Sequence, residues 1–405
     1  MKIVFTITAR NYLSLALTLG DSISILNPEL LFYIYVVDGL DGIEVATLRH
    51  QIINVEDDPR LFSEANAFKY DVTEYCTSLK PAIFQTLFFD NKDCDLIYYL
   101  DPDVYVFNSL GKITDEFPDK SLFLSPHVNL CRVQDFNPIA DRRHLWEGIF
   151  NLGFCAIRRS NAGNFILEWW NDRLQSNCYA DHIDGLHTDQ KWMDYAPVYF
   201  KEDLKIVDHP GVNVAHWNLA ERGISRSGDT LLSNTRRLIF FHFSGFDLSN
   251  KSLTRHVDIA DQLYFHGLVK EMAISYREKL ESNFYQKYIG YSYKYNYFLD
   301  GSPVTKFQRR LFRVYCDDGK YLGNPFDIHD EFRVAIESAG LVDFSDEAAQ
   351  NYRANSVSNL GKKIQTLNFI LRCLKIIIGI KFYCYVIKCM QRYARFENHF
   401  FLLKK

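Results

Sequence analysis

Residues 96–107 read Leu-Ile-Tyr-Tyr-Leu-Asp-Pro-Asp-Val-Tyr-Val-Phe. Most of what the sequence predicts about fold and function follows from this stretch. Five apolar residues are followed by two carboxylates, Asp101 and Asp103, and then by a second apolar run. The first run has the continuous apolar character of a strand that is buried on both faces. Residues two apart in a straight strand point to the same side. The sequence therefore predicts two neighbouring carboxylates at the end of a buried strand.

Two neighbouring carboxylates at a buried position are costly unless a cation neutralises them. Hard divalent cations prefer oxygen ligands, and Mg²⁺ or Mn²⁺ also binds the oxygens of a diphosphate. His242 lies near the end of another apolar run, Leu238–Phe243, and is a candidate third ligand. A nitrogen ligand favours Mn²⁺ over Mg²⁺. We expect a site for Mn²⁺ (or Mg²⁺), and the alternative for His242 is a core histidine with a satisfied hydrogen bond.

The first 250 residues alternate between short apolar runs and amphipathic segments. This order predicts an α/β fold with a mostly parallel sheet and helices on both faces, in which ligands bind at the carboxyl ends of the strands. Besides the stretch at 96–107, we expect strands at 2–8, 31–38, 52–55, 122–125, 153–158, 198–200 and 238–243, and helices at 11–26, 73–89 and 161–174.

The rest of the chain has a different pattern, with expected helices at 264–288, 327–340 and 345–356. We therefore expect three domains: residues 1–251 as the α/β domain, 252–361 as a helical extension, and 362–405 as a basic tail. The short segment 223–230 is expected to be flexible and to cover the ligand site as a lid.

The tail concentrates the positive charge of the chain. From Lys362 onward it carries ten Lys or Arg and one acid, Glu397, a net charge of +9, so the remainder carries −13 of the total of −4. The segments 367–378 and 380–393 are basic and amphipathic, with a break at Gly379, which is typical of helices that lie in the plane of a membrane surface. The alternative is a pair of helices docked on the acidic body. No uncharged run is long enough to span a bilayer, and an acidic body argues against nucleic acid as a partner.

The nine cysteines show no metal-binding spacing, and their odd number favours free thiols in a reducing compartment. The first apolar run is too short for a signal-peptide core. We therefore expect a cytoplasmic protein that is peripheral on the inner face of the cytoplasmic membrane.

Five short motifs occur in a fixed order over about residues 1–250. They are Thr8, Asp101 with Asp103, Asn151 with Gly153, Asp189 with Gln190, and His242 with Gly245. In their order and spacing the sequence resembles the retaining glycosyltransferases of the family 8 type, such as the lipooligosaccharide galactosyltransferases and glycogenin. Those enzymes have the GT-A fold, a Rossmann-like nucleotide-sugar-binding domain. The segment 213–219 looks more like the bacterial polysaccharide-assembly branch of this fold.

The resemblance implies a nucleotide-sugar donor, expected to be a UDP-sugar, bound through Mn²⁺ at the metal site described above. It implies that Thr8 and Asn11 line the nucleotide pocket and that Asp38 approaches the base or the ribose. Lys80 would neutralise the diphosphate or contact the sugar. The family's usual Lys-Pro-Trp after the last motif is absent here, so Lys251 or Arg255 would have to replace its lysine.

The resemblance also assigns the donor sugar. Asn151 and Asp189 would bind its hydroxyl groups, and Gln190 would face the anomeric carbon. Gly153 and Gly245 would form part of the same donor site. Because a carboxamide is a poor nucleophile, same-face transfer with retention is favoured, with Gln190 and Asp189 stabilising the oxocarbenium-like state.

The acceptor is expected to be a glycan in the assembly of a bacterial surface polysaccharide or lipopolysaccharide, and the basic tail suggests a lipid-linked one. An inverting enzyme with Asp189 as base is the first alternative. A sugar nucleotidyltransferase is the second, although no Gly-rich loop follows the first strand. A non-catalytic carbohydrate-binding protein is the third.

Overall fold

The computed structural model describes residues 1–130, 138–249, 252–255, 265–316, 321–342 and 360–403. The chain forms two compact units. The first comprises Met1–Phe62 and Val72–Tyr293, and the second comprises Ser63–Asp71 and Lys294–Lys405. The domain boundaries expected at residues 251 and 361 stay predictions.

A seven-stranded sheet forms the centre of the first unit, in the order β10-β6-β7-β4-β1-β2-β3. Strand β7 is antiparallel to β4 and β6, and the other neighbouring pairs are parallel. The expected α/β fold with a mostly parallel sheet is therefore confirmed. The strands are β1 (Lys2–Thr8), β2 (Leu31–Val36), β3 (Gln51–Asn54), β4 (Leu96–Leu100), β6 (Leu122–Pro126), β7 (Phe150–Arg158) and β10 (Leu204–Ile206).

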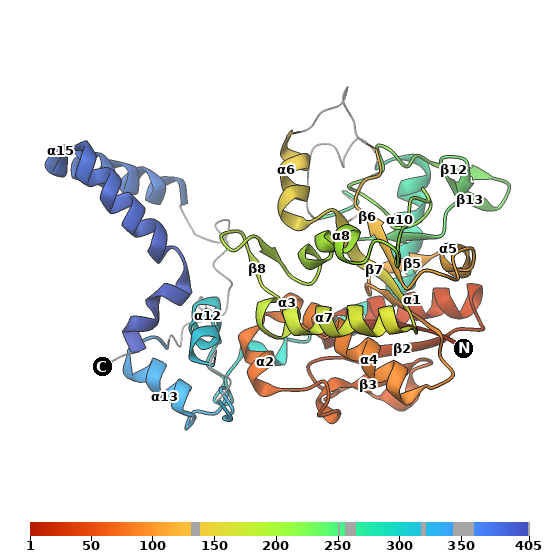
Figure 1. Cartoon of the computed structure of the whole chain (residues 1–405), viewed down its shortest axis with the longest axis horizontal. Coiled ribbons are helices and arrows are strands. Elements are labelled where there is room, and N and C mark those ends of the chain that lie inside the picture. Colours follow the sequence, from red (N-terminus) through yellow and green to blue (C-terminus); the bar gives the residue numbers. More distant parts are fainter. Residues whose placement is uncertain (131–137, 250–251, 256–264, 317–320, 343–359, 404–405) are drawn as a thin grey trace. The chain divides into compact units, whose positions relative to one another are not determined.

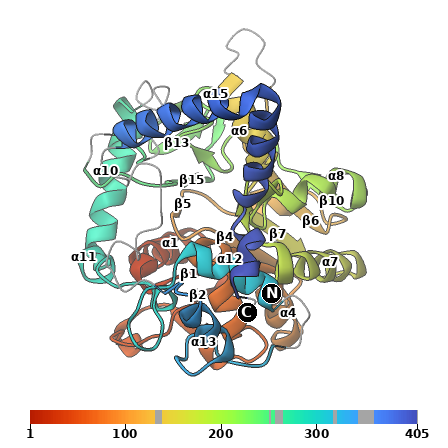
Figure 2. The same ribbon diagram turned by 90° about the vertical axis from the view of Figure 1, so that its left-hand side faces the viewer.

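Helices cover both faces of this sheet, as the alternating pattern predicts. Helix α1 (Leu13–Leu26) shares one apolar cluster with Val4 and Ile34. On the opposite face, Phe84 of α4 (Lys80–Asp90) packs edge-to-face on Phe5, with ring centroids 4.8 Å apart. Helix α7 (Asn161–Asn177) lies beside α4 (Figures 1 and 2). Successive strand residues point to opposite faces, so neighbouring residues of β1 meet different helices.

A second, three-stranded sheet positions the candidate site. Its order is β11 (Val214–Ala215), β15 (Phe240–His242) and β5 (Val104–Val106). Strand β5 follows β4 after a short turn and pairs antiparallel with β15, with His242 opposite Val104. This register brings the end of β15 to the turn that contains Asp101 and Asp103.

The segment expected as a flexible lid forms part of a small antiparallel sheet instead. Strands β12 (Ile224–Ser227), β13 (Thr230–Ser233) and β14 (Arg236–Arg237) pair in that order. The remaining short elements of the first unit are η1 (Arg10–Tyr12), η2 (Val45–Thr47), η3 (Val55–Asp57), α5 (Gly111–Thr114), α6 (Pro138–Glu147), β8 (Ala180–Asp181), β9 (Leu186–His187) and η4 (Lys191–Tyr195).

Three expected elements need correction. The strand expected at 198–200 is wrong, because Ala196–Tyr199 form helix α8, with Pro197 in its first turn. Proline is favoured there, and Val198 is 76% exposed rather than buried as a strand core would be. The helix expected at 73–89 is split into α3 (Val72–Ser78) and α4. The helix expected at 264–288 is likewise split, into α10 (Gly267–Ser282) and α11 (Tyr285–Tyr288), and the one at 345–356 lies outside the described residues.

The second unit has an aromatic core of its own. The ring of Phe68 contacts those of Phe298, Phe312, Phe326 and Phe332, with centroids 4.9–5.7 Å apart. Its described elements are α2 (Glu64–Lys69), η5 (Lys294–Asn296), α12 (Lys306–Tyr315), α13 (Glu331–Ser338), α15 (Leu360–Tyr393) and η7 (Phe396–Leu403).

Helix α15 consists of two helical segments that meet at Gly379, whose backbone is not helical (φ 72°, ψ 162°). The two segments run in different directions (Figures 1 and 2). The break expected at this glycine is therefore confirmed. Among the described helices, none has the length and apolar character needed to cross a membrane.

Candidate active site

Three side chains from three strand ends converge at the carboxyl end of β4. Asp101 follows β4, Asp103 precedes β5, and His242 is the last residue of β15. Nε2 of His242 lies 3.0 Å from Oδ1 of Asp103 and 3.7 Å from Oδ2 of Asp101. The ligand atoms of these residues all lie within 4.8 Å of one another. The structure therefore brings together the three side chains that the sequence predicts as metal ligands.

The charges of this group depend on one another. Burial alone would raise the pKa of Asp103, but the charge and hydrogen bond of His242 lower it below its usual value. Burial likewise opposes protonation of His242, yet Asp103 and then Asp101 raise its pKa. Without a metal, the imidazolium compensates the two carboxylates. A divalent cation would replace the proton on Nε2, so the donor set fits such an ion.

Lys80 is a buried cation beside this group. Its Nζ lies 2.8 Å from Oδ2 of Asp189 and 4.0 Å from Oδ1 of Asp101. It donates a hydrogen bond to the carbonyl oxygen of Leu152 (2.8 Å) and sits 4.2 Å from the ring centroid of Tyr99. Burial opposes its charge, but Asp189 and Asp101 outweigh that effect and raise the pKa of Lys80. Lys80 thus links two residues that the resemblance assigns to the donor site.

Tyr99 holds one oxygen of Asp101. Its buried hydroxyl donates to Oδ1 of Asp101 at 2.6 Å, which leaves Oδ2 facing His242. The sequence analysis included Tyr99 in the stretch that ends in the two carboxylates but gave it no role in the site. The available signal was its position two residues before Asp101, since such residues share a side of the strand.

The residues expected to bind the donor sugar lie next to this group. Oδ1 of Asn151 accepts hydrogen bonds from the backbone N–H of Gly153 (3.1 Å) and from Nδ2 of Asn213 (3.0 Å). The carboxamide of Gln190 is held by two backbone contacts, because Oε1 accepts from the Leu152 N–H (3.1 Å) and Nε2 donates to the Glu147 carbonyl (2.7 Å). The side chain of Gln190 is therefore oriented by the backbone.

Glycine is favoured at positions 153 and 245, the two glycines expected in the donor site, for different structural reasons. A Cβ on Gly153 would overlap with Cε1 of His242 and lie 2.7 Å from its Nδ1, so glycine is needed for the imidazole to pack against the backbone. Gly245 has a φ of 62° in the turn after β15, a conformation that glycine adopts without strain.

The residues expected at the nucleotide lie at the carboxyl ends of β1 and β2. Thr8 ends β1, and its hydroxyl donates to the carbonyl of Ala9 (2.9 Å). Asp38 is fully buried just after β2, and its Oδ1 accepts from the backbone N–H of Arg10 (2.8 Å). Asn11 lies in η1, directly after Arg10. Sequence reasoning missed Arg10, whose Nε also lies 3.5 Å from Oδ2 of Asp38.

Arg255 is the described candidate for the missing family lysine. Its backbone N–H donates to the carbonyl of Gly245 (2.7 Å), and its Nη2 donates to the hydroxyl of Tyr12 (3.0 Å). Its charge is one of the causes that lower the pKa of Asp103. Lys251, the other candidate, lies outside the described residues.

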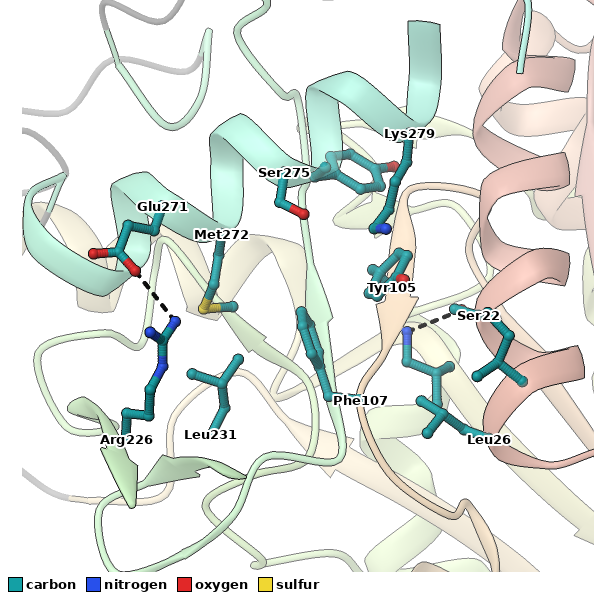
Figure 3. Close-up of a pocket in the computed structure, with 13 residues that line it drawn as sticks. Ser22, Leu26, Tyr105, Phe107, Arg226, Leu231, Glu271, Met272, Ser275 and Lys279 are labelled. Carbon is teal, nitrogen blue, oxygen red and sulfur yellow. Dashed lines mark hydrogen bonds and ion pairs between the residues drawn. The ribbon is translucent and has the colours of Figure 1, made fainter. Parts of the chain in front are cut away.

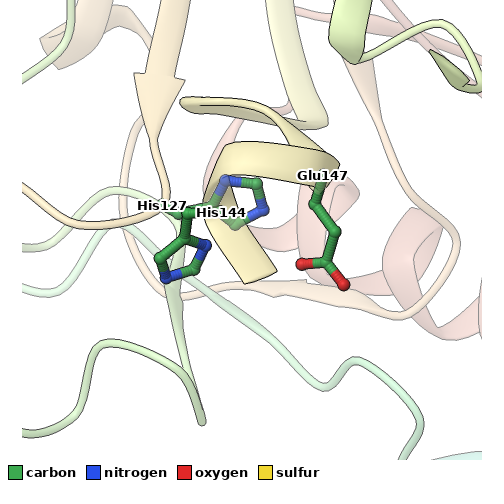
Figure 4. A group of neighbouring side chains, drawn as sticks. All are labelled: His127, His144 and Glu147. Atoms are coloured by element: carbon green, nitrogen blue, oxygen red, sulfur yellow. The ribbon is translucent and has the colours of Figure 1, made fainter. Parts of the chain in front are cut away.

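A second group with metal-ligand chemistry lies close by. His127 follows β6, whereas His144 and Glu147 come from α6 (Figure 4). However, Nδ1 of His127 lies 3.3 Å from the carbonyl oxygen of Ile149, and its Nε2 lies 3.3 Å from Nδ2 of Asn151. Both ring nitrogens of His127 are thus used in hydrogen bonds, and we assign no metal to this group.

A pocket of about 540 Å³ lies between α1, β5, the β12–β13 hairpin and α10 (Figure 3). Tyr105, Phe107 and Met272 contribute apolar walls, and Arg226 and Glu271 form an ion pair (3.2 Å) at its edge. None of the three candidate metal ligands lines this pocket.

No protein-family model matches the chain. Two similar curated proteins are both uncharacterised proteins of Bacillus subtilis (strain 168). YfnF is 31% identical over 177 residues, which is 44% of this chain and 58% of YfnF. YfnD is 28% identical over 200 residues, which is 49% of this chain and 61% of YfnD. The chain thus spans less than two thirds of each of these relatives.

Several solved structures are distantly similar. One is the galactosyltransferase LgtC in complex with donor and acceptor sugar analogs, at a TM-score of 0.40 and 17% identity, covering 70% of this chain and 96% of that one. Another is a glycosyltransferase involved in glycosylation of the major capsid of PBCV-1, at 0.37 and 12%, covering 69% and 98%. The glycosyltransferase GlyE of Streptococcus pneumoniae TIGR4 matches at 0.36 and 15%, covering 73% and 66%.

Proposed function

We propose that this chain is a metal-dependent glycosyltransferase of the GT-A fold, which transfers a hexose-type sugar from a nucleotide-sugar, expected to be a UDP-sugar, to a glycan acceptor. The observation that carries the proposal is the convergence of Asp101, Asp103 and His242 at the carboxyl end of a central strand. In sheets of this kind ligands bind at that edge. Thr8 ends β1 and Asp38 follows the neighbouring strand β2 of the same sheet, where a nucleotide would lie.

The chemistry of the three ligands supports Mn²⁺. Two carboxylates and one imidazole suit this ion and leave coordination positions for the oxygens of a diphosphate. When bound, the ion would stabilise the negative charge that develops on the leaving diphosphate. The side chains of Asp101, Asp103 and His242 would hold it there.

The cationic side chains of the chain itself support the departure of a diphosphate. Lys80 is charged and buried 4.0 Å from Asp101, and Arg255 acts electrostatically on Asp103. Fixed cations in a water-poor site stabilise developing negative charge more strongly than they would in water. Lys80 also holds the carboxylate of Asp189 in place.

We infer that transfer proceeds with retention. The carboxamide of Gln190 is held by two backbone contacts and is a poor nucleophile. It therefore suits electrostatic stabilisation of a same-face transfer, together with Asp189. The anomeric configuration of the product, read by NMR, tests this inference: an α-linked product from an α-configured donor supports retention, and a β-linked product indicates an inverting enzyme.

A donor-hydrolysis panel tests the proposed function. The chain is incubated with Mn²⁺ and UDP-, GDP-, dTDP- or CMP-sugars, and nucleotide release is measured. We expect release from one donor, lost on chelation and in Asp103→Ala. Asp229→Ala, at an exposed hairpin turn, is the matched control and should behave like the unmodified chain. Absence of both hydrolysis and metal-dependent nucleotide binding would refute the proposal.

For the tail, we propose binding to an anionic membrane surface on the cytoplasmic face, with a lipid-linked glycan of surface polysaccharide or lipopolysaccharide assembly as acceptor. Support comes from α15, where Phe369, Ile376 and Ile377 are 67–79% exposed between basic residues such as Lys375 and Lys381. Exposed apolar side chains interleaved with basic ones are typical of helices at a membrane surface.

The segment η7, which follows α15, packs on α12, with Phe396 against Phe307. Truncation of the tail would remove this contact as well, so substitutions within α15 test membrane binding more cleanly. Replacing Ile376 and Ile377 with Ser, or Lys375 and Lys381 with Gln, should reduce sedimentation with anionic vesicles. Vesicles of neutral lipid should bind less in every case. Unchanged sedimentation of both variants would instead favour helices docked on protein.

A further inference from the structure

Asn213 has an unusual backbone conformation beside the candidate metal site. It is fully buried, just before β11, and its φ is 55°. Its carbonyl oxygen accepts hydrogen bonds from Nδ2 of Asn218 (3.0 Å) and Nη1 of Arg222 (3.3 Å). Residues other than glycine rarely adopt positive φ, and such strain persists where the surroundings enforce it, often at functional sites.

The side chain of Asn213 connects two parts of the site. Its Nδ2 donates to Oδ1 of Asn151 (3.0 Å), and its Oδ1 lies 3.2 Å from Nδ1 of His242. Beyond Asn151, the chain of contacts continues to His127 and from there to the carbonyl oxygen of Ile149. An unbroken run of hydrogen bonds thus joins that carbonyl to the imidazole of His242.

Backbone groups at Gly153 and Ile149 fix the direction of every hydrogen bond in this run. The N–H of Gly153 can only donate, so the Asn151 atom that it meets is the oxygen. Asn213 must then present its NH₂ group to that oxygen, which leaves its own oxygen facing His242. A carbonyl oxygen can only accept, so Nδ1 of His242 carries a proton. The ring nitrogen that faces Asp103, Nε2, is then the one available to a metal ion.

The hydrogen bonds at the His127 end of the run are consistent with the direction assigned at the His242 end. The carbonyl of Ile149 requires a proton on Nδ1 of His127, so its Nε2 accepts from Asn151. Burial, together with the neighbouring His144, lowers the pKa of His127 to about 3, so this ring is neutral at pH 7. The ring of Trp217 lies edge-on to both His127 and His242, with centroids 5.6 and 5.3 Å away. Trp217 therefore packs against both histidines of the run.

We propose that Asn213 is a positioning residue that fixes the tautomer of His242 for metal binding and simultaneously orients Asn151 at the donor sugar. The inference rests on the proposed function, since it deepens the roles of the metal ligand and the sugar-binding residue. Metal-bound histidines commonly donate their second N–H to such a partner, and loss of that partner typically weakens metal affinity by about 10- to 100-fold. Asparagine suits the position because it tolerates positive φ better than most residues.

Two variants of Asn213 test the proposal through Mn²⁺ binding, measured by titration calorimetry on the full chain. Asn213→Gly keeps the positive φ but removes both hydrogen bonds, so Mn²⁺ affinity should fall by about 10- to 100-fold. Asn234→Gly is the matched control. Asn234 is exposed, also has positive φ (52°) and accepts from the N–H of Gly223, and its replacement should leave Mn²⁺ affinity unchanged.

Asn213→Asp separates positioning from a merely structural role. Its carboxylate still accepts from Nδ1–H of His242, so Mn²⁺ affinity should be retained or increased. It cannot donate to Oδ1 of Asn151, so binding of the donor sugar should weaken and the KM for the donor should rise. A merely structural role would reduce metal and donor binding together. Because aspartate has nearly the same size and also tolerates positive φ, this variant keeps the test decisive if Asn213→Gly does not fold.

The outcomes distinguish this inference from the proposed function. If the unmodified chain and Asp103→Ala show the same lack of Mn²⁺ binding, both are wrong. If the unmodified chain binds Mn²⁺, Asp103→Ala does not, and Asn213→Gly binds as tightly as the unmodified chain, only the role of Asn213 is wrong. Equal loss of Mn²⁺ affinity in Asn213→Asp and Asn213→Gly would also overturn it.

Discussion

Replacement of Lys80 by Met should destabilise the protein strongly. Both partners of the Lys80–Asp189 pair are only 2% exposed, and their charged atoms lie 2.8 Å apart. Methionine fills a similar volume, so the main loss is the charge, which leaves Asp189 buried without its cation. Breaking a buried pair by removing one partner costs about 3–5 kcal/mol. The carbonyl of Leu152 also loses its donor.

Thermal and chemical denaturation of the full chain measure this effect. At roughly 2–4 °C per kcal/mol for domains of 150–250 residues, Tm should fall by about 6–20 °C. The double variant Lys80→Met/Asp189→Leu should recover much of the loss, because replacing both charges with apolar groups is often neutral or stabilising. Lys92→Met, at an exposed position, is the control and should change stability little.

The pH dependence follows from the raised pKa of Lys80. A cation whose folded pKa lies above its unfolded value stabilises the folded state fully below the unfolded value, here near 10.5. That contribution is lost only as the pH rises through the folded pKa, so it is complete at pH 7. A loss below about 1 kcal/mol in Lys80→Met, against the 3–5 expected, would refute the reasoning. A double variant no more stable than the single one would do the same.

Three further predictions concern the metal site and the second unit. Gly153→Ala should weaken Mn²⁺ binding at least about tenfold, because the added Cβ would overlap with His242. Gly361→Ala, where the added Cβ meets open space, is the control and should leave Mn²⁺ binding unchanged. Equal Mn²⁺ affinities of the two variants in calorimetry would contradict this prediction. Mn²⁺ binding should strengthen as the pH rises through the raised pKa of His242, since the metal replaces the proton on Nε2. Calorimetry in buffers of different ionisation enthalpy should detect that proton, and pH-independent affinity would count against it. Arg309→Met should lower Tm, because the buried guanidinium donates to three carbonyls at the C-terminal end of α2 and unsatisfied acceptors there would cost about 3 kcal/mol. Arg173→Met, at a half-exposed side chain, is the control. An equal Tm for both variants would show that these hydrogen bonds contribute little.

The elements that the sequence predicted well are those with long or fully buried runs. Strands β1, β2 and β4 lie where continuous apolar stretches stand, because strands covered by helices on both faces must be apolar on both faces. The error at α8 arose from a run of only three residues at 198–200. So short a run cannot distinguish a strand from one helical turn, and the proline before it was the better signal.

Local spacing in the sequence was enough to identify some residues of the site, whereas others were identified only from tertiary contacts. The pair Asp101 and Asp103 followed from its place after an apolar run. Tyr99 could have been found from its position two residues before Asp101. The segment 213–219 stood out in the sequence, but nothing in it distinguished Asn213, because the positive φ of this residue and its contact with His242 arise only in the folded chain.

The sequence by itself determined the α/β class, most strand positions and which strand ends carry polar side chains, because burial imposes a repeating pattern on consecutive residues. Only the tertiary structure decided which of those ends meet. The register of β15 against β5 places His242 beside Asp103, and the packing of α4 places Lys80 between Asp189 and Asp101. The pairing of β15 with β5 and the packing of α4 both join residues that are far apart in the chain, so the sequence around each residue does not reveal its neighbour in the site.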